Sequence, residues 1–238
     1  MERLQKVIAN SGFTSRRKAE EYITKGLVKV NGNIVYELGT KVNYNDLIEV
    51  NGYIIKNENK VYYLLNKPRG VITSTNDDKG RKTVVDLVKT NIRIYPVGRL
   101  DYDTTGALIL TNDGEFANMI MHPKSQLDKV YIAKINGLIG KKQLQTLERG
   151  VYIDGIKTSK AKARIKKYDK KTNTSIVELI IHEGKNHQVK KMFESIGYKV
   201  LKLKRERISF LDVNNLKSGE YRVLNPKEIK KLYNEVSK

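Results

Sequence analysis

Apolar positions in the first 55 residues follow a helical repeat and then change to short extended runs. Leu4, Val7 and Ile8 are spaced to share one face of a short helix. A second helix is expected to begin after Thr14 or Ser15, because either hydroxyl can accept a hydrogen bond from the first turn. The extended runs that follow are separated by two Asn-Gly pairs, which suit the positive φ angles of tight hairpin turns: Asn31-Gly32 and Asn51-Gly52. Two helices followed by short strands predict a compact first domain over residues 1–55.

From residue 61 onward, extended and helical patterns alternate in no regular order, and the polar stretch 56–60 before them is expected to be a linker. Many long strands with few helices between them predict an α+β second domain, 61–238, around a mixed, mainly antiparallel β-sheet. The expected strands are 61–66, 70–73, 105–110, 127–136, 160–168, 173–181 and 199–210, and the expected helices are 83–88, 114–121, 140–148, 186–196 and 226–236.

Composition excludes several classes of protein. The 238 residues include no Cys, so disulfides, Cys-ligated zinc, iron–sulfur clusters and thiol catalysis are not expected, and a reducing cytoplasm is the expected location. No apolar run approaches the roughly 18 residues that span a bilayer, and the chain begins with an amphipathic segment. We therefore expect neither membrane insertion nor secretion.

The net charge of +20 indicates a polyanionic partner, although an AT-rich genome that favours Lys codons is an alternative explanation. Residues 1–60 hold 10 Lys or Arg and 7 Asp or Glu, so residues 61–238 carry +17 of the excess. Within the second domain, residues 157–171 hold eight basic side chains against one acidic, and residues 185–207 hold eight against two. Such clusters are either solvated surface or sites that neutralise phosphates.

The chain lacks the usual signatures of cofactor and metal chemistry. None of its three His residues forms a pair at helical metal-ligand spacing. Gly98, Gly106 and Gly114 are too far apart for a dinucleotide fingerprint or a triphosphate loop, and there is no Gly-x-Ser-x-Gly elbow. We expect no cofactor and no bound metal.

An acidic cluster remains as the candidate for chemistry. Asp103 and Asp113 suit the turns in which they occur, where Asp side chains bind local backbone donors. Asp101 differs because it directly follows Arg99 and Leu100 in a loop, and we expect it to lie in the most positive part of the molecule. A carboxylate there stays ionised, as a nucleophile must.

The first 55 residues resemble a known RNA-binding module. Residues 4–9 (LQKVIA), 15–20 (SRRKAE) and 26–32 (GLVKVNG) are similar to an S4 domain. The resemblance implies that structured RNA is bound by the basic second helix and the strand after it. The residues implied in this contact are Arg16, Arg17 and Lys18.

Residues 98–114, GRLDYDTTGALILTNDG, resemble the signature of the RsuA/RluB-type pseudouridine synthases, a family in which an S4 domain often comes first. The resemblance covers essentially the whole chain and implies that Asp101 is the catalytic residue. Residues 129–133, KVYIA, resemble the Lys-x-Tyr strand of the family, which implies that Tyr131 packs against the target base.

Two later segments complete the resemblance. Residues 183–193, EGKNHQVKKMF, resemble the third motif, which implies that Lys190 pairs with the catalytic Asp. Many members carry Arg at this position and at Lys185, and Lys acts as a point charge instead of a bidentate fork. Residues 201–208 resemble the closing strand, which implies that Leu203 is an apolar wall beneath the base.

The resemblance implies an enzyme that isomerises one uridine of ribosomal RNA to pseudouridine, without cofactor or metal, after the base is flipped outward. Asp101 would attack either ribose C1′ or uracil C6, and Arg99 would either position the flipped nucleotide or hold the loop. Further expected RNA contacts are Lys185, Lys191, Lys204 and Arg205.

Residues 186–200, NHQVKKMFESIGYKV, are most similar to the RluB-type branch, so 23S rRNA of the large subunit is the expected substrate. One alternative is an enzyme that modifies 16S rRNA, and another is a non-catalytic RNA-binding factor of ribosome assembly. A monomer is expected in each case.

Overall fold

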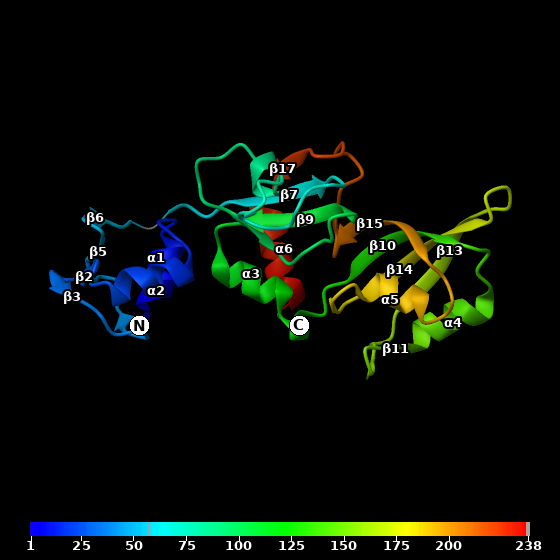
Figure 1. Cartoon of the computed structure of the whole chain (residues 1–238), viewed down its shortest axis with the longest axis horizontal. Coiled ribbons are helices and arrows are strands. Elements are labelled where there is room, and N and C mark those ends of the chain that lie inside the picture. The colour runs from blue at the N-terminus through cyan, green and yellow to red at the C-terminus, as the bar shows by residue number, and fades with distance from the viewer. Residues whose placement is uncertain (57, 237–238) are drawn as a thin grey trace. The chain divides into compact units, whose positions relative to one another are not determined.

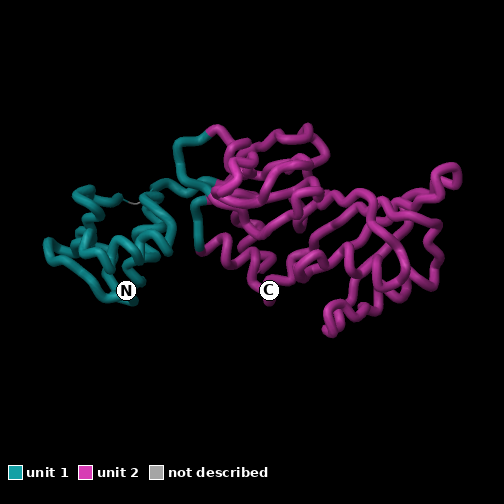
Figure 2. Tube along the Cα trace, viewed as in Figure 1, with its two compact units in different colours: residues 1–61, 90–94, 112–114 teal, residues 62–89, 95–111, 115–238 magenta. Residues whose placement is uncertain are grey.

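The computed structural model describes residues 1–56 and 58–236. Asn57, in the stretch 56–60 predicted as a linker, lies outside the described residues, as do residues 237 and 238 at the end of the predicted second domain. The chain divides into two compact units (Figure 2). The first unit contains residues 1–61, 90–94 and 112–114, and the second contains residues 62–89, 95–111 and 115–238.

The first unit contains two short helices and small antiparallel sheets. Its elements are β1 (Glu2–Arg3), α1 (Leu4–Asn10), α2 (Arg16–Thr24), β2 (Val28–Val30), β3 (Asn33–Ile34), β4 (Lys41–Val42), β5 (Ile48–Val50) and β6 (Tyr53–Ile54). Strand β4 pairs with β1, and the other strands pair in the order β3-β2-β5-β6. Helix α2 begins where the sequence predicts, because Ser15 Oγ accepts a hydrogen bond from the Lys18 N–H at 3.2 Å.

Both Asn-Gly pairs of the first unit adopt the predicted turn geometry. Asn31 and Gly32 have φ angles of 51° and 84°, and Asn51 and Gly52 have φ angles of 50° and 85°. The hairpins bring their apolar residues onto the two helices and form a small core: Leu4, Ile8, Ala19, Ile23, Val28, Val42, Ile48 and Val50.

The second unit combines a large sheet with short helices (Figure 1). Its elements are β7 (Tyr62–Lys67), η1 (Val85–Leu87), β8 (Tyr95–Val97), β9 (Thr105–Thr111), α3 (Gly114–Met121), η2 (Pro123–Ser125), β10 (Lys129–Asn136), α4 (Lys141–Arg149), β11 (Tyr152–Ile153), β12 (Ile156–Lys157), β13 (Lys162–Asp169), β14 (Thr174–Ile181), α5 (Gln188–Glu194), β15 (Val200–Ile208), β16 (Leu211–Asp212), β17 (Tyr221–Val223) and α6 (Pro226–Val236).

The described residues of the second unit form a nine-stranded sheet with the path β13-β14-β10-β15-β9-β7-β17, to which β16 adds beside β15 and β8 beside β9. Neighbouring strands are antiparallel except β9 and β15, which pair in parallel at Thr105 with Lys204 and at Gly106 with Arg205. The predicted α+β class with a mixed, mainly antiparallel sheet is confirmed. Figure 1 shows α3 and α6 against β7 and β9, where Phe116 and Leu232 enter the core, while α4 and α5 lie beside β10, β13 and β14.

The parallel seam between β9 and β15 depends on Gly106. This residue has a φ of +107°, a conformation that residues with a side chain rarely adopt. A Cβ atom at this position would overlap the Arg205 carbonyl oxygen and would lie 2.8 Å from the carbonyl carbon. Glycine therefore lets the two strands approach closely, directly after the loop that carries Asp101.

Two predicted elements of the second unit are wrong. Residues 70–73 make only an isolated bridge between Ile72 and Thr83, because the chain turns at once and the Ser74 N–H donates to the Ile72 carbonyl at 3.1 Å. Within 83–88 the chain forms only the single turn η1, Val85–Leu87, and no α-helix, since the carboxylate of Asp86 binds the Thr83 N–H at 2.8 Å. Short strands β8, β16 and β17 were not expected from the sequence.

Candidate active site

Asp101 lies in the loop between β8 and β9, and buried contacts fix the backbone of this loop. The Thr73 hydroxyl donates to the Leu100 carbonyl at 2.6 Å and accepts from the Leu100 N–H at 3.3 Å. The Thr104 N–H donates to the Asp101 carbonyl at 3.1 Å and closes a turn. The backbone of the loop is therefore held both at Leu100 and at Thr104.

Lys67, at the end of β7, supports the same loop from the interior. Its side chain is fully buried, and Nζ donates to the carbonyls of Asp101 and Thr104, each at 3.0 Å. Burial lowers the pKa of Lys67 to about 8, an effect that the nearby carboxylates of Asp101 and Asp103 partly oppose. Sequence reasoning missed Lys67, because a lysine that ends a strand usually reaches solvent.

The Asp101 carboxylate contacts two basic side chains of the α5 region. Its Oδ2 lies 2.9 Å from Lys190 Nζ and 2.9 Å from His187 Nδ1. His187 is the N-cap of α5, and Lys190 follows three residues later, a spacing that places both on one face of the helix. The Asp101 side chain is 30% exposed, so its carboxylate remains open to a ligand. Sequence reasoning missed His187, although it lies within the segment that resembles the third family motif.

Lys190 also joins Asp101 to Asp103. Its Nζ lies 2.7 Å from Asp103 Oδ1, so one ammonium group binds two carboxylates. Burial alone would lower the pKa of Lys190, but hydrogen bonds to Asp103 and Asp101 outweigh burial and raise it. The same bond lowers the pKa of Asp103. Asp103 is therefore more than the turn residue that its sequence context indicates.

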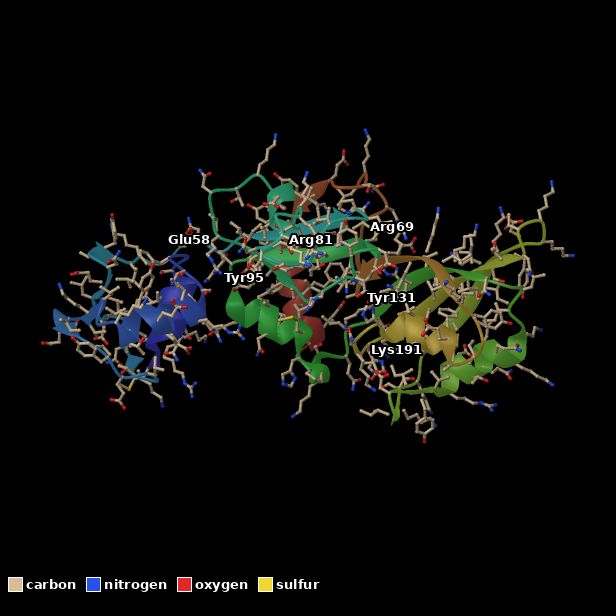
Figure 3. All side chains as sticks on the ribbon, in the orientation of Figure 1. Glu58, Arg69, Arg81, Tyr95, Tyr131 and Lys191 are labelled. Carbon is tan, nitrogen blue, oxygen red and sulfur yellow. The ribbon has the colours of Figure 1, made fainter. Side chains whose placement is uncertain are left out.

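A pocket forms beside the Asp101 carboxylate. Tyr131 of β10 and Leu203 of β15 are each 8% exposed, and both line it (Figure 3 labels Tyr131). The two strands are neighbours, with Tyr131 opposite Arg205 and Ala133 opposite Leu203, so the two wall residues lie diagonally on one face. The pocket thus brings together Arg99, Asp101, Tyr131, Lys190 and Leu203, five side chains that the sequence places in four separate segments.

Comparisons with known proteins place this geometry in a family. The family model described as RNA pseudouridylate synthase matches residues 61–195, and the model described as S4 domain matches residues 2–48. The chain belongs to the RNA pseudouridylate synthase family. The family resemblance noted in the sequence is thereby confirmed.

Relatives of this pseudouridylate synthase match over nearly its whole length. It is 58% identical over 234 residues to the ribosomal large subunit pseudouridine synthase B of Bacillus subtilis (strain 168), with 98% of this chain and 96% of that protein covered. It is 41% identical to an uncharacterized RNA pseudouridine synthase of Aquifex aeolicus (strain VF5), with 98% and 94% covered. A crystal structure of a pseudouridylate synthase is similar at a TM-score of 0.70 and 32% identity, with 98% of this chain and all of that chain covered.

The predicted RNA contacts of this pseudouridylate synthase lie in different surroundings. In the first unit, Arg16, Arg17 and Lys18 are exposed at the start of α2, and Lys18 forms an ion pair with Glu21 at 2.6 Å. In the second unit, Lys185 lines the pocket and has its Nζ 3.4 Å from Glu183. Lys191 on α5 is bound to Asp154 (Figure 3 labels Lys191), and Lys204 on β15 is half-buried.

The prediction that Arg205 contacts RNA is wrong for the structure as it stands. Arg205 is 4% exposed, its Nε donates to the Ala107 carbonyl at 2.7 Å, and its Nη1 lies 3.5 Å from the Tyr131 hydroxyl. Side chains alternate along β15, so Arg205 shares the buried face of Leu203. Its guanidinium braces the wall of the pocket instead of reaching phosphates.

The described residues show neither a metal-binding cluster nor a membrane-spanning helix. Across residues 1–56 and 58–236, no three His, Asp or Glu side chains converge to form a group that could hold a metal ion. No helix of the same residues is long and apolar enough to cross a membrane.

Proposed function

We propose that this chain converts a uridine of large-subunit ribosomal RNA to pseudouridine. The observation that carries the proposal is the Asp101 carboxylate, which is bound to Lys190 beside a pocket walled by Tyr131 and Leu203. Family membership supports the reaction, and the 58% identity to a protein named as a large-subunit enzyme supports the choice of rRNA.

The reaction is an isomerisation that needs no oxidant, reductant or energy source. The N1–C1′ bond breaks, the uracil turns, and a C5–C1′ bond forms while C5 loses a proton and N1 gains one. A stacked uridine cannot enter the pocket, so the nucleotide must flip outward at a cost of a few kcal/mol. Contacts between basic side chains and flanking phosphates offset this cost.

Asp101 acts as the nucleophile in this proposal. Lys190 Nζ and His187 Nδ1 both bind Oδ2 of its carboxylate. The carboxylate attacks either at C1′ of the ribose or at C6 of the uracil. Lys190 and His187 hold the carboxylate from one side, and Asp103 positions Lys190 through their 2.7 Å bond.

Tyr131 and Leu203 hold the uracil ring while it turns. Tyr131 stacks on the base, and Leu203 closes the apolar side, because both side chains line the pocket that contains Asp101. Thr104 supplies a polar contact: its side chain is 2% exposed, it lines the same pocket, and its hydroxyl has no hydrogen-bond partner among the described residues. Because a buried unpaired hydroxyl is unfavourable, an edge of the uracil is its proposed partner.

Arg99 positions the flipped nucleotide in this proposal. Its side chain is exposed at the pocket, whereas Thr73 and Lys67 already hold the loop. Holding the loop, which the sequence left open as the alternative role of Arg99, is thus done by Thr73 and Lys67. A guanidinium at the rim of the pocket suits a phosphate next to the target uridine.

We assign binding of structured rRNA to residues 1–55 and the chemistry to residues 61–238, joined by the linker 56–60. The exposed Arg16 and Arg17 of α2 support this division. We also propose that the protein is a monomer and acts on rRNA in the cytoplasm. Deletion of residues 1–55 should weaken rRNA binding while turnover on a saturating short RNA persists. Loss of turnover at saturation would contradict the division.

The proposal is tested by mapping pseudouridine in rRNA from cells that lack the gene. We expect one site in 23S rRNA to disappear and to return with the wild-type gene. Loss of a site in 16S rRNA would instead assign the enzyme to the small subunit. An unchanged map, together with normal rRNA binding, would favour a non-catalytic assembly factor.

A further inference from the structure

A second groove lies on the sheet of the second unit, next to the Asp101 pocket. Apolar and basic side chains line it, and we name it the basic groove. Its defining residues are Arg69, Ile132, Lys134, Ile176, Lys202 and Lys204. Asp103 and Leu203 also line the groove, and Leu203 lines the Asp101 pocket as well. Because side chains alternate along β10 and β15, the pocket with Tyr131 and the groove with its lysines open on opposite faces of these strands and meet at Leu203.

Strand register explains how the lysines gather. Lys134 on β10 lies directly opposite Lys202 on β15 and opposite Ile176 on β14, while Ile132 lies opposite Lys204. The residues that alternate with them, such as Ala133, are buried on the other face of the sheet. The lysines and the two isoleucines therefore share the open face, where Ile132 and Ile176 remain half-exposed.

The cations that line the basic groove outnumber its carboxylates. Within the described part of the chain, no carboxylate forms an ion pair with Arg69, Lys134, Lys202 or Lys204 (Figure 3 labels Arg69). By contrast, Arg164 on the neighbouring strand β13 binds Glu178 at 2.6 Å. The carboxylate of Asp103, which lines the groove, is bound to Lys190 and also attracts Arg69. The groove thus carries four cations against one lining carboxylate, which is shared with Lys190.

This arrangement is unfavourable for the empty protein. Like charges directly opposite each other on neighbouring strands destabilise a sheet, and Lys134 and Lys202 are such a pair. A bound anion between them removes this repulsion. The apolar floor formed by Ile132 and Ile176 adds a surface on which a flat ring can lie.

We propose that the basic groove binds the RNA strand that flanks the target uridine. Phosphates contact Arg69, Lys134, Lys202 and Lys204, and a base lies over Ile132 and Ile176. This inference rests on the proposed function, because a strand whose uridine lies beside Asp101 reaches the opposite face of β10 and β15 at Leu203 and Asp103, which line the groove. Cations that alternate with apolar surface match the phosphates and bases of a single strand better than the carboxylates of an acidic peptide.

The test compares two double variants with the same change in charge. Lys134→Gln with Lys202→Gln alters the groove, and Lys227→Gln with Lys230→Gln alters exposed positions on α6. Binding of a fluorescent fragment of 23S rRNA is measured by anisotropy at several salt concentrations, and turnover is measured at saturating RNA.

We expect the groove variant to weaken binding about tenfold and to reduce the slope of log K against log salt by about 1.4, or about 0.7 for each lost phosphate contact. Its kcat at saturation should stay within about twofold of wild type. Its melting temperature without RNA should equal or exceed that of wild type, because the opposed lysine pair is gone. The α6 variant should bind as wild type does.

Equal binding and equal salt slopes for the two double variants would overturn the proposal. Loss of turnover at saturating RNA would also overturn it, because the lysines would then act within the catalytic site. If the groove variant binds RNA as wild type does but no longer binds an acidic peptide, the occupant of the groove is a protein and the RNA proposal is rejected. If wild type makes no pseudouridine, the proposed function fails, but the binding comparison still decides whether the groove holds RNA.

Discussion

Gly106→Ala tests whether the close seam between β9 and β15 positions the catalytic loop. The new Cβ would overlap the Arg205 carbonyl, and the φ of +107° would be strained for alanine. Overpacking against backbone costs about 1–3 kcal/mol, and a disfavoured backbone conformation costs about 1–3 kcal/mol. The sum of about 2–6 kcal/mol corresponds to a fall in melting temperature of about 4–24 °C for a chain of this size.

Gly197→Ala is the matched control. Gly197 has a φ of +86°, but a Cβ there would meet no atom within 4 Å, so only the conformational cost of about 1–2 kcal/mol applies. Thermal denaturation and release of tritium from RNA labelled at uracil C5 are measured for both variants. Because a displacement of 1 Å can lower a rate about 100-fold, Gly106→Ala should lose turnover at temperatures where it is still folded, while Gly197→Ala should retain it. Equal melting temperatures and full turnover for Gly106→Ala would refute this reasoning.

Three further variants test single contacts. Because burial lowers the pKa of Lys67 from 10.5 to about 8, the unfolded chain binds this proton more tightly, so Lys67 should raise the unfolding free energy of wild type between about pH 8 and 10.5, by up to about 3 kcal/mol. Burial lowers the pKa of Lys129 to about 8 as well, so urea denaturation of Lys67→Met should show a rise that is smaller than in wild type by the share of Lys67. Lys190→Ala should lower kcat about tenfold to a thousandfold, and NMR titration should show the lowered pKa of Asp103 returning toward its ordinary value. Lys190→Arg should keep more of the wild-type kcat and more of the lowered pKa of Asp103. Equal kcat values for the two variants would show that charge at this position is dispensable. Thr104→Val should lower kcat/KM about tenfold without lowering the melting temperature, and a drop in stability with normal kcat/KM would assign the hydroxyl a structural role.

Sequence patterns correctly predicted the helices and turns that are determined by residues close together in the chain. The repeat of Leu4, Val7 and Ile8 found α1, and the Asn-Gly pairs found both hairpin turns, because a helical face and a positive φ depend on neighbouring residues only. Residues 70–73 and 83–88 were predicted wrongly, since a single hydrogen bond from Ser74 or to Asp86 decides those conformations.

The site shows a similar division. Asp101, Tyr131, Lys190 and Leu203 come from distant segments, so only their resemblance to family motifs grouped them before the pocket was known. Lys67 could not be found in this way, because its three carbonyl partners meet only in the folded loop.

Arg205 is an instructive error. The density of basic residues in 201–208 suggested an RNA contact, but the alternation of LKLKRERI already places Arg205 on the same face as Leu203. Strand periodicity applied to the basic cluster would have separated the buried Arg205 from Lys202 and Lys204. Those two lysines lie on the open face and belong to the basic groove.

The central claim is that Asp101 performs the isomerisation, and a single-turnover assay tests it most directly. Purified wild type and Asp101→Asn are mixed in excess with 23S rRNA labelled with tritium at uracil C5, and pseudouridine is mapped in the product. We predict one modified uridine and matching tritium release with wild type. Asp101→Asn should bind the rRNA with similar affinity but form no pseudouridine. Pseudouridine formation by Asp101→Asn at a rate near that of wild type would contradict the account.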